Sequence, residues 1–356
     1  MQVGIPREIK PLEGRVALTP EACSSLVHAG HSVSVQQDAG LLSGYPDAQY
    51  VAAGASIVTD ASAVYGTAQL IVKVKEPIGA ELEQLQRHHL LFCFLHLAAY
   101  PELAARLCAT GLTSVGFETV ETDSGMLPLL APMSDIAGRL AAQIGASLLQ
   151  QPQGGKGLLL GGLPGAERGR VVIVGAGNAG GSAAAMAAAI GAEVVVFDLR
   201  RERLAAMRAL GNNVTGLYPY PDALAREIAS ADLLIGAALK TGARAPHIVS
   251  RDMVRSMQPG SVCIDISVDQ GGCIETTRPT SYAQPTYVEE GVVHFAVTNM
   301  PGAVPRSATQ ALSAALMPYV LQICQPDWKT ESAELRRGIN TAAGELIHPA
   351  LKESLA

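Results

Sequence analysis

The stretch RVVIVGAGNAGG at residues 170–181 decides the fold of the second half of the chain. An apolar run leads into a G-x-G-x-x-G turn over Gly175, Gly177 and Gly180, and the Ala-rich run after the turn is typical of a helix. In such a turn the first glycine allows a tight bend, the second lets backbone approach a pyrophosphate, and the third permits close helix packing. The stretch therefore predicts the strand, turn and helix of a dinucleotide-binding unit, with helix N–H groups facing the phosphates.

The next apolar run outward, AEVVVFD, ends in Asp198, 18 residues after Gly180. An acidic side chain there accepts hydrogen bonds from the adenosine ribose and repels a ribose 2′-phosphate, which favours NAD. Taken alone, Asp198 is also compatible with a solvated strand end. Arg200, Arg201 and Arg203 follow closely, either as helix-surface residues or as partners that neutralise a 2′-phosphate. Asp198 thus favours NAD as the cofactor, but the nearby arginines leave NADP open.

The rest of the chain alternates short apolar runs with stretches of helical spacing, which predicts α/β units around mostly parallel sheets. The runs ADLLIGAAL and SVCIDIS are typical of strands buried on both faces. In the first 130 residues the predicted strands are Gln2–Ile5, Ser32–Gln36, Gln69–Val74, His89–Leu95 and Thr113–Gly116. The predicted helices there are Thr19–Ala29, Asp47–Ala53 and Pro101–Ala109.

Two long helical stretches, 133–150 and 307–324, flank the second half. We therefore predict two Rossmann-like, doubly wound α/β domains joined by two long helices. The expected domains are a substrate and catalytic domain at 1–130 plus 307–356, and an NAD-binding domain at 131–306. The glycine-rich segment 154–169 between them is predicted to be an ordered hairpin, with Leu158–Leu160 as one strand.

Composition narrows the class of protein. The 356 residues carry 26 Lys and Arg against 32 Asp and Glu, a net charge of −6, and are 48% hydrophobic. This lack of a basic surplus argues against a nucleic-acid partner. The six cysteines contain no C-x-x-C pair, so we expect a reducing, cytoplasmic location and no metal site. We identify no secretory signal and no convincing membrane span.

Polar residues that follow apolar strands are the candidates for a site, because ligands bind at the carboxyl ends of strands in open α/β sheets. Lys75, His96, Asp269 and the pair Asn299–Met300 occupy such positions. Each alone is compatible with a surface or turn residue, but together they supply a cation, a group that titrates near neutrality and a carboxylate. Arg15, in the loop E-G-R-V, has a guanidinium suited to clamp a carboxylate.

Eight stretches, in one order along the chain, carry a family pattern: VGIPREIKPLEGRVALTP (3–20), KVKEP (73–77), FLHLAA (94–99), LPLLAPMSDIAGRLAAQIGA (127–146), GGKGLLLGGLPG (154–165), VVIVGAGNAG (171–180), DISVDQGGCIETTRPT (265–280) and NMPGAVPRSATQALSAALMPYVL (299–321). In these stretches the chain resembles bacterial alanine dehydrogenases, which share their fold with the nucleotide-binding α subunit of proton-translocating transhydrogenase.

The resemblance implies reversible, NAD-dependent oxidative deamination of L-alanine to pyruvate and ammonium by a homohexamer. It implies that Arg15 and Lys75 bind the substrate carboxylate and polarise its carbonyl, that His96 is the acid/base group, and that Asp269 is a second catalytic residue. It also implies the dinucleotide contacts, which are Ser134, Gly175, Gly177, Asn178, Ala179, Gly180, Asp198, Leu239, Asn299 and Met300.

Three other functions stay open at this stage. The first is a related small-amino-acid dehydrogenase that acts on glyoxylate and glycine or on another 2-oxo acid. The second is a transhydrogenase-like NAD-binding subunit, and the third is a catalytically silent dinucleotide-binding protein. The chain departs from the family at Lys240–Thr241, in the arginine-rich run at 198–204 and after residue 325.

Overall fold

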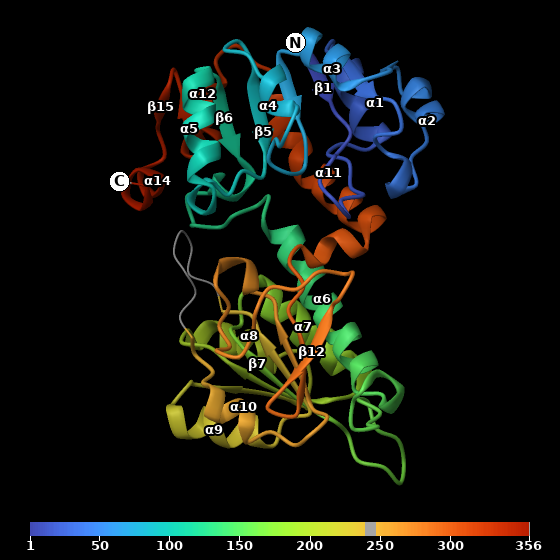
Figure 1. Ribbon diagram of the computed structural model, residues 1–356, viewed down its shortest axis with the longest axis vertical. Coiled ribbons are helices and arrows are strands. Elements are labelled where there is room, and N and C mark those ends of the chain that lie inside the picture. Colours follow the sequence, from blue (N-terminus) through green and yellow to red (C-terminus); the bar gives the residue numbers. More distant parts are fainter. Residues whose placement is uncertain (239–246, 356) are drawn as a thin grey trace. The chain divides into compact units, whose positions relative to one another are not determined.

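The computed structural model describes residues 1–238 and 247–355. The chain divides into two compact units, which are labelled by element in Figure 1. Unit 1 comprises Met1–Met133 and Gly302–Ala356, and unit 2 comprises Ser134–Pro301. Each unit is built around one sheet of mostly parallel strands flanked by helices. The predicted α/β class with two Rossmann-like units is therefore confirmed.

Unit 1 contains an eight-stranded sheet in the order β15-β14-β6-β5-β4-β1-β2-β3. Strands β1 to β6 are mutually parallel, and β14 and β15 add antiparallel edge strands. The strands are β1 (Gln2–Ile5), β2 (Ser32–Gln36), β3 (Ser56–Val58), β4 (Leu70–Val72), β5 (Leu90–Cys93), β6 (Thr113–Gly116), β14 (Ile339–Ala342) and β15 (Glu345–Leu346). The order 6-5-4-1-2-3 is that of a doubly wound fold, with its switch point between β1 and β4.

The helices of unit 1 follow local sequence signals. Helix α1 begins at Pro20, a residue preset for the first helical position, and the Thr19 hydroxyl caps it by accepting from the N–H of Ala22. The predicted strands 2–5, 32–36 and 113–116 are confirmed at both ends. The helices are α1 (Pro20–His28), α2 (Asp47–Ala52), α3 (Ala61–Thr67), α4 (Glu81–Gln84), α5 (Pro101–Thr110), α11 (Pro305–Ile323), α12 (Trp328–Glu331), α13 (Ala333–Arg337) and α14 (Pro349–Ser354).

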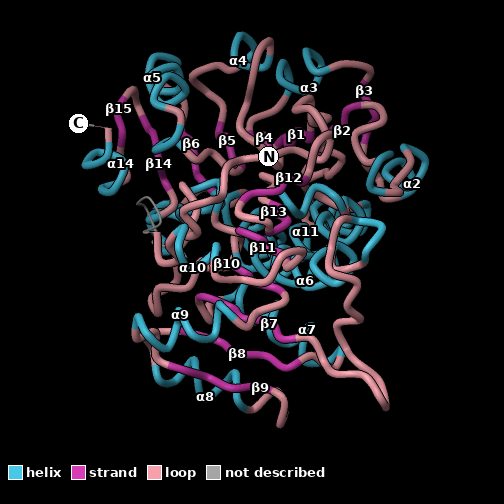
Figure 2. The backbone as a smooth tube through the Cα atoms, turned by 60° about the horizontal axis from the view of Figure 1, so that its bottom comes forward, coloured by secondary structure: helices cyan, strands magenta, loops and turns pink. Residues whose placement is uncertain are grey.

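Unit 2 contains a seven-stranded sheet in the order β12-β13-β11-β10-β7-β8-β9. Figure 2 shows β7, β8 and β9 side by side. Apart from the antiparallel β12, the strands follow the doubly wound order, with the switch point between β7 and β10. The strands are β7 (Arg170–Val174), β8 (Glu193–Phe197), β9 (Val214–Leu217), β10 (Leu233–Gly236), β11 (Val262–Asp265), β12 (Thr286–Glu289) and β13 (Val292–Phe295).

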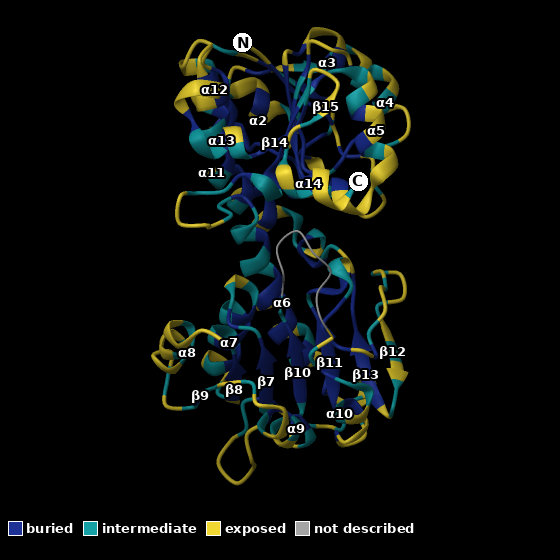
Figure 3. Cartoon of the chain, turned by 90° about the vertical axis from the view of Figure 1, so that its left-hand side faces the viewer, coloured by how far each residue is buried: buried dark blue, intermediate teal, exposed yellow. Residues whose placement is uncertain are grey.

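The helices of unit 2 are α6 (Ala131–Leu148), which begins in the last residues of unit 1, α7 (Asn178–Ile190), α8 (Arg201–Arg208), α9 (Pro221–Ala229) and α10 (Arg251–Arg255). Long helices are thus present at both predicted places, as α6 and α11. Figure 3 shows the central strands as dark, buried elements. Every residue of β10 and β11 is buried, in agreement with the continuous apolar runs that predicted them.

The predicted strand Leu158–Leu160 in the segment 154–169 is wrong, because these residues form no strand. Of the predicted hairpin there is only a short turn, in which Leu163 and Ala166 form an isolated antiparallel bridge and the Gly169 N–H donates to the Leu160 carbonyl at 2.9 Å. The glycines explain the missing strand, because Gly157 and Gly162, which lie on either side of Leu158–Leu160, adopt positive φ angles of 80° and 62° that interrupt an extended strand. The segment is instead an irregular loop.

Candidate active site

Arg15, Lys75 and His96 follow three neighbouring strands of unit 1. Arg15 lies in the loop after β1, Lys75 follows β4 and His96 follows β5. These strands are adjacent and parallel in the order β5-β4-β1, so their carboxyl ends lie at one edge of the sheet. Arg15 and Lys75 therefore follow the two strands that flank the switch point, and the charge of Arg15 lowers the pKa of Lys75.

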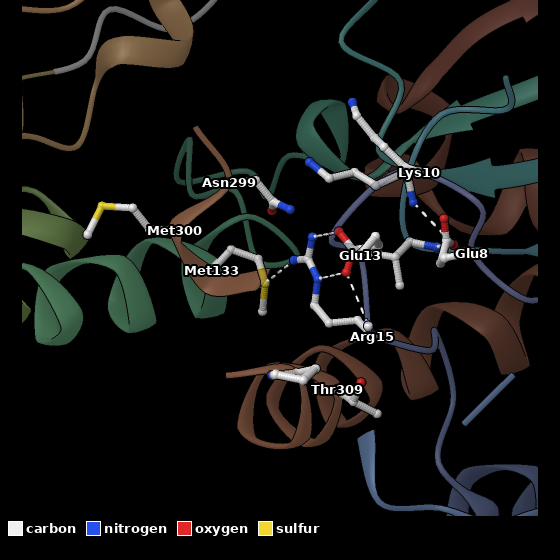
Figure 4. Close-up of polar contacts among 12 residues, drawn as sticks. Glu8, Lys10, Glu13, Arg15, Met133, Asn299, Met300 and Thr309 are labelled. Carbon is white, nitrogen blue, oxygen red and sulfur yellow. Dashed lines mark hydrogen bonds and ion pairs between the residues drawn. The ribbon is translucent and has the colours of Figure 1, made fainter. Parts of the chain in front are cut away.

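Helix α11 holds the loop that carries Arg15. The Val16 N–H donates to the Thr309 hydroxyl at 3.1 Å, and the Thr19 N–H donates to the Ser313 hydroxyl at 3.0 Å. Both hydroxyls lie on the buried face of α11. A helix near the C-terminus therefore positions a loop near the N-terminus, and Figure 4 shows Thr309 beside this loop.

Arg15 pairs with Glu13, a residue that sequence analysis did not single out (Figure 4). Its Nε donates to Glu13 Oε1 at 2.6 Å and its Nη2 donates to Glu13 Oε2 at 2.5 Å, while Nη1 lies 3.1 Å from the Met133 sulfur. Arg15 is only 2% exposed. Burial alone would raise the pKa of Glu13, but the hydrogen bonds and charge of Arg15 lower it to about 2. The only hint of this ion pair in the sequence was the E-G-R motif, which places a glutamate two residues before the arginine.

We expect Glu13→Gln to lower stability in a pH-dependent way. The pKa of Glu13 in the folded chain, about 2, lies below the ordinary value of 4.5, so its ionisation stabilises the fold above about pH 4.5. This contribution, on the order of 3 kcal/mol, is lost as the pH falls through 2. Thermal unfolding followed from pH 7 to pH 2 should therefore show the deficit of the variant shrinking as the pH falls. The exposed Glu353→Gln is the matched control, and a constant deficit would contradict the expectation.

Lys75 is a partly buried cation on which the charge of Arg15 acts. Burial lowers its pKa first, and the charge of Arg15 lowers it further. Glu8 holds its backbone, because Glu8 Oε1 accepts from the Val74 N–H at 2.6 Å and from the Lys75 N–H at 3.4 Å. A lysine with a lowered pKa loses its proton more readily than a surface lysine, which suits a group that must exchange protons with a ligand.

A buried ionic cluster lies directly behind Lys75, and we call Glu8, Lys73 and Glu81 the Lys73 cluster. Lys73 is 1% exposed, and its Nζ lies 3.3 Å from Glu8 Oε2 and 3.0 Å from Glu81 Oε2. Burial would lower the pKa of Lys73, but the two carboxylates raise it. Tyr65 also donates to Glu81, at 3.2 Å. The cluster links the loop after β1 to the loop after β4 and to α4.

His96 occupies an unusual backbone position. Its φ of 50° and ψ of 38° are in the left-handed region, which few residues with a Cβ adopt. Its ring stacks on that of Phe94, with centroids 5.7 Å apart and an interplanar angle of 3°. Glu118, in the 3-10 turn Phe117–Thr119 after β6, accepts from the His96 N–H at 2.6 Å. The side chain of His96 is 35% exposed, so it is accessible at the end of β5.

The glycine turn of unit 2 leaves space for a ligand. Gly175 has a φ of +102°, and a Cβ on Gly180 would lie 1.8 Å from the Gly175 carbonyl oxygen, so both positions require glycine. Among residues 1–238 and 247–355, a Cβ on Gly177 would meet only Arg203, at 3.8 Å. Gly177 is the N-cap of α7 and makes no side-chain cap, so Asn178 and Ala179 open the helix with N–H groups that suit an anion. These features fit the pyrophosphate of a dinucleotide.

Asp198 stands at the end of β8, beside the glycine turn. Its Oδ2 accepts from the Ala176 N–H at 2.8 Å, and its Oδ1 accepts from the Arg200 N–H at 2.8 Å. Arg203 Nη1 lies 3.5 Å from Oδ2, whereas the side chain of Arg201 is exposed. The carboxylate is therefore tied to the turn and is placed as the ribose-binding position requires.

Replacing Asp198 by asparagine should weaken NADH binding roughly 10- to 100-fold, because a hydrogen bond to a charged group contributes roughly 1.5–3 kcal/mol. The amide oxygen still accepts from Ala176, so the turn is retained. Removing the negative charge should also narrow the gap between NADH and NADPH. Titration of dinucleotide fluorescence measures both affinities without turnover. Asp222→Asn, at an exposed position of α9, is the control, and an unchanged NADH affinity would contradict this assignment.

Asp269 and Asn299 come together in unit 2. Asp269 lies in the 3-10 turn Val268–Gln270 after β11, and its Oδ2 accepts from the Asn299 N–H at 3.4 Å. Asn299 adopts a positive φ of 60° after β13, the neighbour of β11. The buried Met300 begins the next 3-10 turn, and Ser134 lies in α6. Leu239 lies outside the described residues.

Asp265, which sequence analysis did not single out, organises the loop that carries Asp269. Its buried carboxylate accepts from the N–H groups of Ser267, Cys273 and Ile274 at 2.9 to 3.1 Å and from the Thr277 hydroxyl at 2.8 Å. The Asp265 carboxylate therefore has a structural role, because its oxygens accept hydrogen bonds from the loop itself. The candidate for chemistry in this loop is Asp269.

The described residues contain neither a metal-binding cluster nor a helix that could span a membrane. Within 1–238 and 247–355, no three or more His, Cys, Asp or Glu side chains group in a way that would hold a metal ion. The helices of the same residues include none that is both long enough and apolar enough to cross a membrane.

Known proteins resemble the chain along its whole length. The family described as Alanine dehydrogenase/PNT matches with its N-terminal domain at residues 4–137 and its C-terminal domain at residues 141–349. An alanine dehydrogenase of Bacillus subtilis is 47% identical over 100% of this chain and 95% of its own length. One of Methanococcus maripaludis is 46% identical over 99% of this chain and 96% of its own length.

Solved structures agree. One named L-alanine dehydrogenase superimposes with a TM-score of 0.96 at 47% identity and covers 100% of both chains. A transhydrogenase from Sinorhizobium meliloti superimposes with a TM-score of 0.85 at 27% identity, over 98% of this chain and 100% of that one. Matches of this extent, over both units, show that the chain belongs to the alanine dehydrogenase/PNT family.

Proposed function

We propose that this chain is an NAD-dependent amino-acid dehydrogenase that catalyses the reversible oxidative deamination of L-alanine to pyruvate and ammonia. The observation that carries the proposal is the 47% identity to an alanine dehydrogenase over the whole chain. Arg15, Lys75 and His96 at the ends of adjacent strands support it further. NAD supplies the acceptor for the hydride that leaves the Cα of alanine.

Arg15 and Lys75 bind the substrate in this proposal. A guanidinium suits the planar carboxylate that alanine and pyruvate share. The Glu13 pair holds that guanidinium rigidly, since it is fixed through Nε and Nη2. Lys75 donates to the pyruvate carbonyl oxygen, and its lowered pKa favours transfer of a proton there.

His96 and Asp269 are the catalytic residues in this proposal. The alanine ammonium must lose a proton before Cα is oxidised, and the imine that results must add water and expel ammonia, so protons move more than once. The Nδ1 of His96 faces Glu118 at 4.0 Å, and Nε2 is the ring atom that exchanges protons with the substrate. Asp269 is the second polar group and assists these transfers.

The substrate and catalytic domain is assigned to 1–130 plus 307–356, and the NAD-binding domain to 131–306. The proposed dinucleotide contacts are Ser134, Gly175, Gly177, Asn178, Ala179, Gly180, Asp198, Leu239, Asn299 and Met300. The positive φ of Gly175, the open position at Gly177 and the strand-end Asp198 support this set. We further propose a cytoplasmic homohexamer without a nucleic-acid partner. The six free cysteines suit a reducing compartment.

The test is the rate of NADH consumption by the purified chain with pyruvate and ammonium, with NADPH and glyoxylate as parallel arms. We expect turnover that requires ammonium and prefers NADH and pyruvate. Faster turnover on glyoxylate would make the chain a glycine-forming dehydrogenase instead. NADH binding without turnover on any 2-oxo acid would contradict the proposal. It would favour a transhydrogenase-like subunit, because the chain also resembles the transhydrogenase from Sinorhizobium meliloti.

A further inference from the structure

We propose that Glu118 is a positioning residue for His96, which holds the imidazole in place for proton transfer. The inference rests on the role of His96 in the proposed function. It concerns a residue that sequence analysis did not select, and it is carried by the geometry around the end of β5.

His96 cannot hold its conformation by itself. A side chain with a Cβ is disfavoured in the left-handed region, where φ is 50° and ψ is 38°. Such a conformation persists only where the surroundings impose it. Because the left-handed turn follows directly after an extended strand, it also determines the direction in which the imidazole leaves the backbone.

The Glu118 carboxylate accepts hydrogen bonds from the backbone at His96. Oε1 accepts from the His96 N–H at 2.6 Å, and both oxygens lie 3.2 Å from the Leu95 nitrogen. The carboxylate thus bonds two consecutive N–H groups that the left-handed turn takes out of the sheet. The Glu118 side chain is 13% exposed, so water cannot readily replace these bonds.

The turn that carries Glu118 is itself fixed. Strand β6 pairs with β5 up to the level of Cys93 and Gly116, which brings the turn beside His96. Within the turn, the Thr119 hydroxyl donates at 2.8 Å to Oδ1 of Asn340, a residue of strand β14, which pairs with β6. The C-terminal strand therefore supports the turn, and the turn supports His96.

The neighbouring residue of the same turn holds the ring by packing. Phe117 contacts Phe94 edge to face, with ring centroids 5.0 Å apart, and the Phe94 ring stacks on His96. Two consecutive residues, Phe117 and Glu118, thus act on the two parts of His96. Phe117 supports the imidazole plane through Phe94, and Glu118 holds the backbone.

The carboxylate also faces the ring. His96 Nδ1 lies 4.0 Å from Glu118 Oε1, which is beyond hydrogen-bond distance but close enough for charge to act. Because the carboxylate lies on the Nδ1 side, Nε2 is the ring nitrogen left for exchange with the substrate. The charges of Glu118 and Glu121 also act on His348, the N-cap of α14.

The experiment compares Glu118→Ala and Glu118→Gln with the unaltered enzyme in pyruvate, ammonium and NADH. The alanine variant loses the acceptor, and a misplaced catalytic group costs about a hundredfold in rate, so kcat should fall about a hundredfold. KM for pyruvate should change less than about threefold, because Arg15 and Lys75 follow other strands. The glutamine variant keeps an acceptor oxygen and should recover most of kcat.

Rescue by glutamine and the split between kcat and KM separate positioning from simple structural support. The amide oxygen of Glu118→Gln can still accept from the His96 N–H, so this variant should recover kcat, whereas a general loss of structure would raise KM for pyruvate as well as lower kcat. His348→Gln, which removes a ring on which the charge of Glu118 acts, and the exposed Glu102→Gln are the controls and should leave kcat and KM unchanged.

Each outcome is decisive. Unchanged kcat in Glu118→Ala, or equal losses of kcat in both Glu118 variants, would overturn the positioning role. If Glu118→Ala does not fold, Glu118→Asp takes its place, because its shorter side chain keeps the charge but moves the acceptor away from the His96 N–H; a fall in kcat supports the proposal and an unchanged kcat contradicts it. His96→Ala is assayed in parallel, because turnover by that variant would refute the role of His96 itself rather than only that of Glu118.

Discussion

Replacing Lys73 by methionine will lower the free energy of unfolding by about 3–5 kcal/mol, the usual cost of removing one partner from a buried ionic group. Lys73 Nζ lies 3.3 Å from Glu8 Oε2 and 3.0 Å from Glu81 Oε2, and all three side chains are less than 5% exposed. Methionine fills a similar volume but leaves both carboxylates buried without their cation. The midpoint of thermal unfolding at a fixed protein concentration measures the loss.

Two further variants make this expectation specific. Lys352→Met, at an exposed position of α14, should change the midpoint little. Combining Lys73→Met with Glu8→Gln and Glu81→Gln removes the uncompensated charges, so it should recover part of the loss. A Lys73→Met midpoint equal to that of Lys352→Met would show that the Lys73 cluster contributes nothing to stability.

Replacing His96 by asparagine should lower kcat by a factor of roughly 10²–10⁴, the usual contribution of a general acid or base. Asparagine is the replacement of choice because it tolerates the left-handed conformation better than other residues with a Cβ. The backbone at φ 50° and its bond to Glu118 are therefore retained while the titrating ring is lost. Steady-state rates with pyruvate, ammonium and NADH measure the effect.

NADH affinity separates this loss from misfolding, because the residues proposed to bind the dinucleotide lie in unit 2. The dissociation constant of the His96→Asn variant should stay within about twofold of the unaltered value. The control is His28→Gln, which replaces an exposed histidine at the end of α1. It should leave both kcat and the dissociation constant of NADH unchanged. Near-normal turnover by a folded His96→Asn variant would mean that another group transfers the proton.

In both units, some features could be predicted from short stretches of sequence. The glycine turn after β7 was predictable because each glycine is required by the local backbone, as the φ of +102° at Gly175 shows. Lys75 and His96 were predictable as candidates because strand ends can be recognised locally, and the doubly wound order then brings them to one edge. The Leu158–Leu160 strand failed for the opposite reason, since positive-φ glycines outweigh a short apolar run.

The partners of the site residues could not be predicted in the same way. Glu118 resembles any other glutamate along the chain, and only the pairing of β6 with β5 brings it to His96. Strand β14 was missed because four residues carry little pattern, and its partner β6 lies more than 200 residues away in the sequence. These contacts arise from sheet topology, which short-range spacing does not encode.

The sequence by itself determined the α/β class, the dinucleotide turn and the family, because these depend on apolar periodicity, glycine conformation and collinear motifs. Tertiary structure alone decided that Arg15 is held by Glu13, that Lys73 is buried between Glu8 and Glu81, and that Glu118 bonds the backbone of His96. The residues that hold these groups lie on other elements of the fold, among them Glu81, Glu118 and helix α11. Their contacts stabilise the site through burial and through the closeness of opposite charges. Both exist only once the sheet of unit 1 has assembled.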